Sequence, residues 1–136
     1  MPAPQVEKVL GPTKREIGKA LRAYNFAAAG SGDYRPMAVT IRDKGKIVGG
    51  LVAETYWDWM YVSLLWVSEP HRGKGWGSSL MQTAEAEARK RGVRNVFLDS
   101  FSFQAPKFYA KLGYREYGRL KDFPAGSDRI SMTKAL

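Results

Sequence analysis

The feature that most constrains the sequence is a glycine-rich turn, Arg72 to Gly77, between an apolar run and an amphipathic one. The run 56–67 predicts a strand, and leucine and alanine at helical spacing predict a helix over about 75–91. Glycines let the backbone approach a ligand closely, and the first N–H groups of a helix have no partner inside it. A turn of this kind favours an anion site suited to phosphate or pyrophosphate, and Arg72 and Lys74 add positive charge there.

The spacing of the glycines argues against two common classes of phosphate-binding loop. The turn lacks the Gly-x-x-x-x-Gly-Lys-Ser/Thr pattern of loops that bind nucleoside triphosphates. It also fails the dinucleotide pattern, because neither Gly73-x-Gly75 nor Gly75-x-Gly77 is followed by a glycine three places on. One alternative stays open at this point, in which the glycines only make a compact turn.

Strands and helices alternate irregularly along the rest of the chain. Thr13 to Glu16 has the Ser/Thr-x-x-Glu form of a helix capping box, and Gly30 is a natural end for the helix that follows. The other expected elements are strands over 6–10, 38–42, 47–53, 93–101, 114–120 and 129–134 and a helix over 105–112. No internal repeat or linker interrupts this order, so one domain is expected over residues 1–136.

Composition excludes several kinds of chemistry. The chain has no cysteine and one histidine, which excludes disulfides, thiolate metal sites, a cysteine nucleophile and a multi-histidine metal centre. No apolar run is long enough to span a bilayer and the start lacks the apolar core of a signal peptide, so a cytoplasmic protein without a membrane partner is expected. The net charge of +9 favours an anionic partner or serves solubility alone. Because the basic residues are spread along the chain, a nucleic-acid partner is not expected.

Two segments resemble one known family. Leu65 to Leu80 is similar to the acetyl-CoA-binding motif of the GNAT-superfamily N-acetyltransferases, Gln/Arg-x-x-Gly-x-Gly/Ala. The motif glycines are Gly73 and Gly75 with Pro70 at the first position, or the register is Arg72-x-x-Gly75-x-Gly77. Ala105 to Tyr114 is similar to the family's Ala-x-x-Phe/Leu-Tyr-x-Lys-x-Gly-Phe/Tyr segment. The resemblance extends from about residue 47 to residue 136.

The resemblance implies an α/β (α+β) fold with a mixed, mostly antiparallel sheet of six to seven strands and helices on both faces. Strands four and five would splay apart, strand four would pair with the pantetheine arm of acetyl-CoA, and the turn would hold its pyrophosphate. An amine would then attack the acetyl thioester directly, with no metal. The coenzyme-binding residues that the resemblance implies are Leu65, Trp66, Val67, Arg72, Gly73, Lys74, Gly75, Trp76, Gly77, Ser78, Phe108 and, where the family usually has asparagine, Ser102.

The resemblance also suggests a general acid. Tyr109 matches the family tyrosine that protonates the departing thiolate, and its alternative role is packing on the sheet. Some family members carry a glutamate as base where this sequence has Trp59, so that role is not carried over. Glu54, at the end of the preceding strand, is the candidate base, whereas Asp58 is expected on the opposite face and Asp99 is expected to be a structural charge.

Four large aromatic residues lie within 57–66. Alternation along one strand puts Trp57, Trp59 and Tyr61 on one face, with Trp66 on the other beside Met60 and Val62. They pack in the core, or they form a wall with Phe123 for a hydrophobic or cationic substrate. The acids that would make the mouth of an acceptor site locally negative are Glu54, Asp58, Asp122 and Asp128.

The sequence therefore predicts an N-acetyltransferase that moves acetyl from acetyl-CoA to a primary amine in a ternary complex. Two alternatives remain open at this point. One is a non-catalytic acyl-CoA-binding or protein-interaction module of the same fold, and the other is a small nucleic-acid-binding domain suggested only by the charge. Small members of the family are often homodimers, so a second copy of the chain is a further candidate partner.

Overall fold

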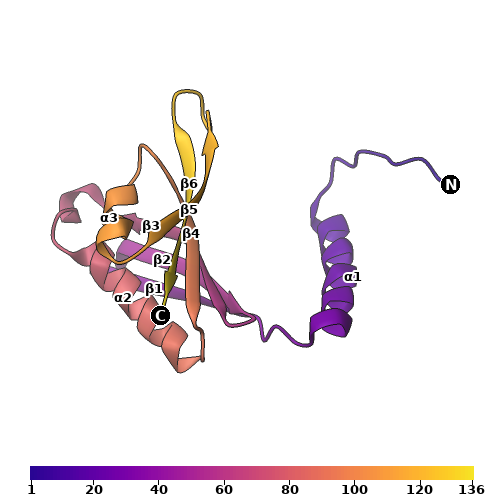
Figure 1. Cartoon of the computed structure of the whole chain (residues 1–136), viewed down its shortest axis with the longest axis horizontal. Coiled ribbons are helices and arrows are strands. Elements are labelled where there is room, and N and C mark those ends of the chain that lie inside the picture. The colour runs from indigo at the N-terminus through magenta and orange to yellow at the C-terminus, as the bar shows by residue number, and fades with distance from the viewer. The chain divides into compact units, whose positions relative to one another are not determined.

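In the computed structural model, which describes residues 1–136, the chain forms two compact units, residues 1–32 and residues 33–136. The first unit holds one α-helix, and the second holds a six-stranded sheet and two α-helices (Figure 1). None of the three helices has both the length and the apolar character needed to cross a membrane.

The first unit is built around α1 (Gly11–Ala29). The helix begins before the predicted capping box, with Pro12 in its first turn, where a missing N–H costs nothing. The Thr13 hydroxyl donates to the Glu7 carboxylate (2.7 Å) instead of capping the helix, so the predicted capping box is wrong. The strand predicted over 6–10 does not form either. The predicted end is confirmed, because Gly30 follows the helix with a φ of 76°.

The sheet of the second unit has the strand order β1-β2-β3-β4-β6-β5. All neighbouring strands are antiparallel except β3 and β4, which are parallel. This confirms the predicted mixed, mostly antiparallel sheet. The crossover from β3 to β4 contains the glycine turn and α2 (Trp76–Lys90), and α3 (Pro106–Lys111) lies between β4 and β5. The strands are β1 (Arg35–Asp43), β2 (Lys46–Tyr56), β3 (Trp59–Val67), β4 (Asn95–Phe101), β5 (Arg115–Lys121) and β6 (Asp128–Ala135).

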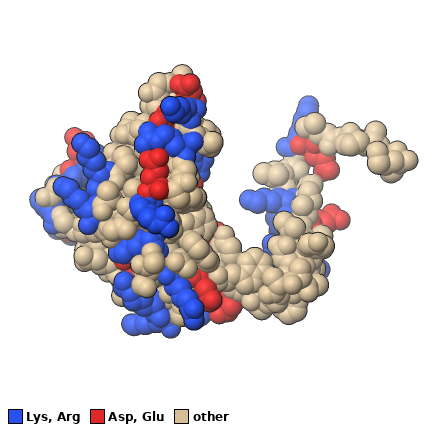
Figure 2. Space-filling model, viewed as in Figure 1, with Lys and Arg blue, Asp and Glu red and all other residues tan.

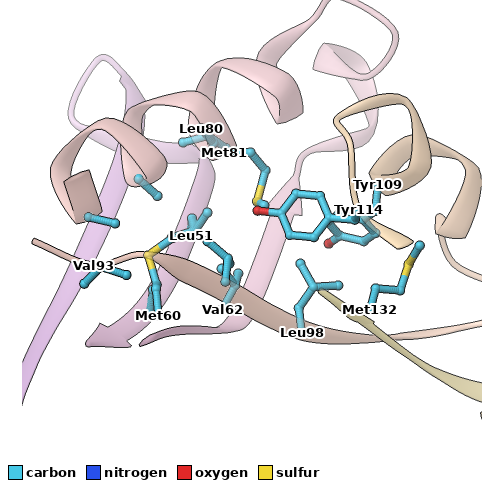
Figure 3. Close-up of a cluster of buried hydrophobic side chains, with 14 of the residues drawn as sticks. Leu51, Met60, Val62, Leu80, Met81, Val93, Leu98, Tyr109, Tyr114 and Met132 are labelled. Atoms are coloured by element: carbon cyan, nitrogen blue, oxygen red, sulfur yellow. The ribbon is translucent and has the colours of Figure 1, made fainter. Parts of the chain in front are cut away.

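One face of the sheet carries the hydrophobic core of residues 33–136. Leu51, Met60 and Leu98 come from three neighbouring strands and are buried almost completely. Leu80 from α2 and Tyr109 from α3 belong to the same cluster, so both helices pack on this face (Figure 3). Each fully buried side chain of this size stabilises the fold by roughly 1.5–3 kcal/mol. The core thus fixes α2 and α3 over the middle of the sheet.

One buried carboxylate ties α2 to the strands. Glu85 of α2 is 3% exposed and accepts hydrogen bonds from the Tyr114 hydroxyl (2.8 Å) and the Lys134 ammonium (2.7 Å). A buried charge is tolerated only when it is paired and hydrogen-bonded in this way. Tyr114 precedes β5 and Lys134 lies on β6, so the carboxylate joins three elements.

A tight turn interrupts the region predicted as one strand over 56–67. Trp57 and Asp58 have φ angles of 45° and 63°, and Tyr56 pairs with Trp59 across them. The two-residue hairpin turn whose twist matches that of its strands requires a positive φ at both central residues. Trp57 and Asp58 meet this requirement. The predicted position of Trp57 is therefore wrong, because it lies in the turn and not on the strand face that carries Trp59 and Tyr61.

A bulge at Ser63 corrects a second prediction for β3. The pairing of β2 with β3 skips this residue, so the alternation of faces changes there. Val62 before the bulge and Leu65 after it both contact the core. Trp66 consequently lies on the face opposite to Met60 and Val62, against the prediction.

β3 and β4 pair only over their first residues. Three pairs join them, and the last is Tyr61 with Phe97. Beyond this pair β3 remains bonded to β2 and β4 remains bonded to β6, while the two strands separate from each other. The splay predicted for strands four and five is confirmed, and these strands are β3 and β4.

Candidate active site

The gap between the splayed strands opens into a cavity of about 790 Å³. Residues 62–67 of β3 line one wall, and residues 98–100 of β4 line the other. The glycine turn, the start of α2 and part of α3 complete the lining. A mostly apolar cavity of this size with a few polar groups is typical of a site for a small molecule.

The glycine turn brings unpaired backbone N–H groups to the cavity. Gly73 and Gly75 have φ angles of 74° and 83°, which glycine adopts at little cost. The first hydrogen bond of α2 runs from the Ser79 N–H to the Gly75 carbonyl (3.0 Å). The N–H groups of residues 76–78 therefore have no partner inside the helix, at the positive end of its dipole. This end of the cavity suits a phosphate group.

The polar side chains of the turn are held by the protein itself. Arg72 donates from Nε to the Val67 carbonyl (2.9 Å), which fixes its guanidinium beside the end of β3. His71 shares a hydrogen bond with the Ser68 hydroxyl and stacks on Trp76, with ring centroids 4.4 Å apart. The arginine, the histidine and the tryptophan all line the cavity, so the turn is a rigid wall.

Tyr109 presents the one phenol in the cavity lining. The residue before it, Phe108, packs so closely on Gly77 that a Cβ there would lie 3.2 Å from the ring, which sets α3 against the start of α2. The Tyr109 hydroxyl makes no hydrogen bond within the protein. Burial raises the pKa of Tyr109, so the phenol holds its proton at neutral pH. A free, protonated hydroxyl in a cavity can donate to a ligand.

The structure brings most of the predicted site residues together at this cavity. They come from three places that are distant in the sequence, namely the end of β3, the turn with the first residues of α2, and α3. The predicted residues in the lining are Leu65, Trp66, Val67, Arg72, Gly73, Gly75, Trp76, Gly77, Ser78, Phe108 and Tyr109.

Three predicted residues do not line the cavity. Lys74 is exposed on the turn. The Ser102 hydroxyl accepts a hydrogen bond from the Asp128 N–H (2.9 Å), so it fixes the start of β6 instead of facing a ligand. Glu54 lies on β2 and its carboxylate accepts a hydrogen bond from the Tyr34 hydroxyl (2.7 Å). The candidate base is therefore not among the groups that the fold brings to the cavity.

Sequence reasoning missed several cavity residues with polar or aromatic side chains, among them Asp99, Phe103 and Gln104. Asp99 is the only carboxylate in the lining. Asp58 and Asp122, which were candidates for an acidic mouth, lie outside it, as Glu54 does. Alternation places Asp99 away from the core, and only the splay of β4 from β3 gives it access to the cavity. The signal that could have found Phe103 and Gln104 is their place in the short loop between the splayed strand and α3.

Comparisons with known proteins agree on one family. The model of the acetyltransferase (GNAT) family matches residues 5–114. An acetyltransferase of Agrobacterium fabrum is 40% identical over 116 residues, which are 82% of this chain and 85% of that protein. A blasticidin-S acetyltransferase of Streptomyces morookaense is 40% identical over 95 residues, 69% of this chain and 70% of that one. The crystal structure of an acetyltransferase from Bacillus cereus has a TM-score of 0.87 at 34% identity and covers 98% of both chains.

The chain belongs to the GNAT family of acetyltransferases.

As a GNAT acetyltransferase the protein is an enzyme whose acetyl donor is acetyl-CoA. The residues at the cavity fit this molecule at its pyrophosphate and along its pantetheine arm. The unpaired N–H groups at the start of α2 suit a pyrophosphate, and the free edge of β3 offers backbone groups to an amide-containing arm. The structure contains no group of three or more histidine, aspartate or glutamate side chains that could hold a metal ion.

Proposed function

We propose that this GNAT enzyme transfers an acetyl group from acetyl-CoA to a primary amine, which attacks the thioester directly while both substrates are bound. One observation carries the proposal. The cavity in the split between β3 and β4 has the start of α2 at one end, and Tyr109 lines the same space.

The chain's own backbone would hold the coenzyme. The N–H groups of residues 76–78 would donate to the pyrophosphate, with the Arg72 guanidinium beside it. Beyond Tyr61 the edge of β3 has no partner strand on the β4 side. Its N–H and carbonyl groups would pair with the amides of the pantetheine arm as they would with an added strand.

Tyr109 would act as the general acid of the transfer. The amine nitrogen forms a bond to the acetyl carbon, and the carbon–sulfur bond breaks with its electron pair on sulfur. Tyr109 gives its proton to that sulfur, and the proton lost by the new amide nitrogen restores the phenol. Direct attack suits a chain without cysteine. Glu54, the candidate base, would have to act through water, since it does not line the cavity.

The purified protein tests this function with a panel of primary amines that includes blasticidin S, a polyamine, an aminoglycoside and a lysine peptide. Release of the CoA thiol is followed by absorbance, and the acetylated amine is identified by mass. We expect at least one amine to gain one acetyl group per thiol released. Acetyl-CoA at one hundred times its dissociation constant should also stabilise the fold by about 2.7 kcal/mol, a measurable rise in melting temperature.

Two negative results have different meanings. Absence of any melting shift at millimolar acetyl-CoA would remove the coenzyme site and with it the proposed function. A clear shift without transfer to any amine would favour the alternative, a non-catalytic acyl-CoA-binding module of the same fold.

The proposed location is the cytoplasm. A second copy of the chain is a proposed partner. The mass in solution, measured by light scattering, tests this state.

A further inference from the structure

Asp99 is the only carboxylate that lines the cavity. It lies on β4, two residues beyond Phe97, the last residue of β4 to pair with β3. Its neighbours Leu98 and Ser100 are buried on the core side, at 1% and 2% exposure. Because side chains alternate along a strand, Asp99 projects from the other face. It therefore enters the split from the side opposite to Tyr109, which belongs to the core cluster.

The Asp99 carboxylate is fixed by two side chains of β6. Oδ1 accepts a hydrogen bond from the Ser131 hydroxyl (2.6 Å), and Oδ2 accepts one from the Arg129 guanidinium (2.8 Å). A carboxylate has about four acceptor positions, so roughly two remain for another donor. The group is thus oriented in advance and still able to bind a cation.

An aromatic cluster, Phe101, Phe103 and Phe123, lies next to this carboxylate. The Arg129 guanidinium lies over the rings of Phe101 and Phe123, at 5.8 and 5.4 Å from their centroids. Phe101 also stacks on Phe103, with centroids 5.3 Å apart. Phe103 lines the cavity and is 62% exposed. This cluster replaces the predicted aromatic wall, since Phe123 contacts Phe101 and not Trp57 or Trp59.

We propose that Asp99 binds the ammonium group of the acceptor and that the aromatic cluster holds a planar or apolar group attached to it. The ammonium gives one proton to solvent before its nitrogen attacks the thioester, so the transfer step itself starts from the neutral amine. This rests on the proposed function, because it names the acceptor class of the same site. The enzyme then selects cationic amines that carry an aromatic or planar portion. A chain with a net charge of +9 repels free cations in general, and one fixed carboxylate at the split gives such a substrate a local partner.

Wild-type selectivity gives the first test. Benzylamine is a cation at neutral pH, aniline of similar shape is neutral, and propylamine is a cation without a ring. We expect benzylamine to have the lowest KM of the three. Equal KM values for benzylamine and aniline would overturn the role of the charge, and equal values for benzylamine and propylamine would overturn the role of the aromatic cluster.

The variant Asp99→Asn gives the second test. It keeps the shape of the side chain and removes its charge, so KM for benzylamine should rise about 10- to 100-fold, as expected for loss of a charge-assisted hydrogen bond. KM for acetyl-CoA should stay near that of the wild type, while the melting temperature should fall moderately because Arg129 loses its charged acceptor. Asp58→Asn is the matched control, because it makes the same charge change on an exposed turn outside the cavity. An unchanged KM for benzylamine in Asp99→Asn would overturn the assignment.

Binding without turnover separates this inference from the proposed function. Benzylamine is titrated into the protein saturated with CoA, which supplies no acetyl group. Binding that weakens in Asp99→Asn supports the acceptor site even if no acetyl transfer is ever observed. Equal binding of benzylamine to both proteins, or no binding to either, overturns the acceptor site whatever the activity assay shows.

Discussion

Two buried tyrosines in contact have different hydrogen-bonding partners. The rings of Tyr109 and Tyr114 lie 5.9 Å apart in one cluster (Figure 3). The Tyr114 hydroxyl donates a hydrogen bond to the buried Glu85, whereas Tyr109 lines the cavity and its hydroxyl has no hydrogen-bond partner in the protein. The variants Tyr114→Phe and Tyr109→Phe, which each remove one hydroxyl, therefore distinguish a phenol that stabilises the fold from a phenol that takes part in the reaction.

Tyr114→Phe should lower the stability and leave the chemistry intact. A hydrogen bond to a charged group contributes about 1.5–3 kcal/mol, so the free energy of unfolding should fall by about that amount at pH 7. Urea denaturation measures it. Acetyl transfer at 25 °C by the remaining folded protein should stay close to that of the wild type, and a large loss of rate would contradict this division of roles.

The pH dependence of the same variant checks the environment of Tyr114. Burial, followed by the charge of Glu85, raises the pKa of Tyr114 above its ordinary value of 10.0. The stabilisation from this group is then fully present below pH 10.0 and is lost as the pH rises above it. The wild type should lose stability above about pH 10 while Tyr114→Phe loses less, so the difference between them should narrow. A constant difference from pH 7 to pH 11 would argue against a buried phenol.

At the scale of elements, the turn before α2 is the part of the fold that serves the ligand most directly. Gly75 has a φ of 83°, and nothing lies within 4 Å of where a Cβ would stand. An added methyl group meets no protein atom there, but it strains the backbone and projects where a ligand would approach.

Gly75→Ala should therefore weaken acetyl-CoA binding at least tenfold, more than backbone strain of about 1 kcal/mol explains. Gly45→Ala is the matched control. Gly45 has a φ of 81° with nothing within 4 Å, and it lies in the hairpin turn between β1 and β2, outside the cavity. Both variants should lose similar stability, and only the first should lose affinity in a calorimetric titration. Equal affinities would show that the turn has a structural role alone.

Regular elements with a strong local signal could be predicted from the sequence. The spacing of leucine and alanine predicts α2, and Gly30 predicts the end of α1. The two segments that resemble the GNAT family predict the separation of β3 from β4. The turn at Trp57 could not be predicted, because its flanking residues read as one continuous apolar strand and its central residues are not the glycine or asparagine that usually mark such turns. The bulge at Ser63 carries no sequence signal either, and a single extra residue moved Trp66 to the other face.

The same limit applies to the site. Backbone groups and apolar walls follow from the motif, so most of the predicted coenzyme residues line the cavity. The place of Glu54 and Ser102 along the chain predicts site roles for them, but both side chains form hydrogen bonds with other groups of the fold. Asp99 reaches the cavity because it lies beyond the last residue of β4 that pairs with β3. The residue at which this pairing ends is known only from the register of the two strands.

At the scale of the whole molecule, charge is the dominant surface property. The chain carries 22 lysines and arginines against 13 aspartates and glutamates, and Figure 2 shows basic side chains interspersed with fewer acidic ones. Such a field attracts a coenzyme with several phosphates and is screened by salt.

KM for acetyl-CoA should accordingly rise several-fold between about 0.05 and 0.5 M sodium chloride. Acetyl-pantetheine carries the same thioester without phosphates, so its KM should change little over that range. Steady-state kinetics with both donors measures the difference. Equal salt dependence for the two donors would assign the effect to the acceptor or to the fold.

The most direct test of the account is single-turnover acetyl transfer by Tyr109→Phe, with Tyr114→Phe as the control for loss of a buried hydroxyl. Single turnover isolates the chemical step from product release. If Tyr109 protonates the departing sulfur in the split between β3 and β4, the variant should transfer acetyl about 10²–10⁴ times more slowly. Its affinity for acetyl-CoA should be unchanged, because the proton is needed only as charge develops on sulfur. A full wild-type single-turnover rate in Tyr109→Phe would contradict the account.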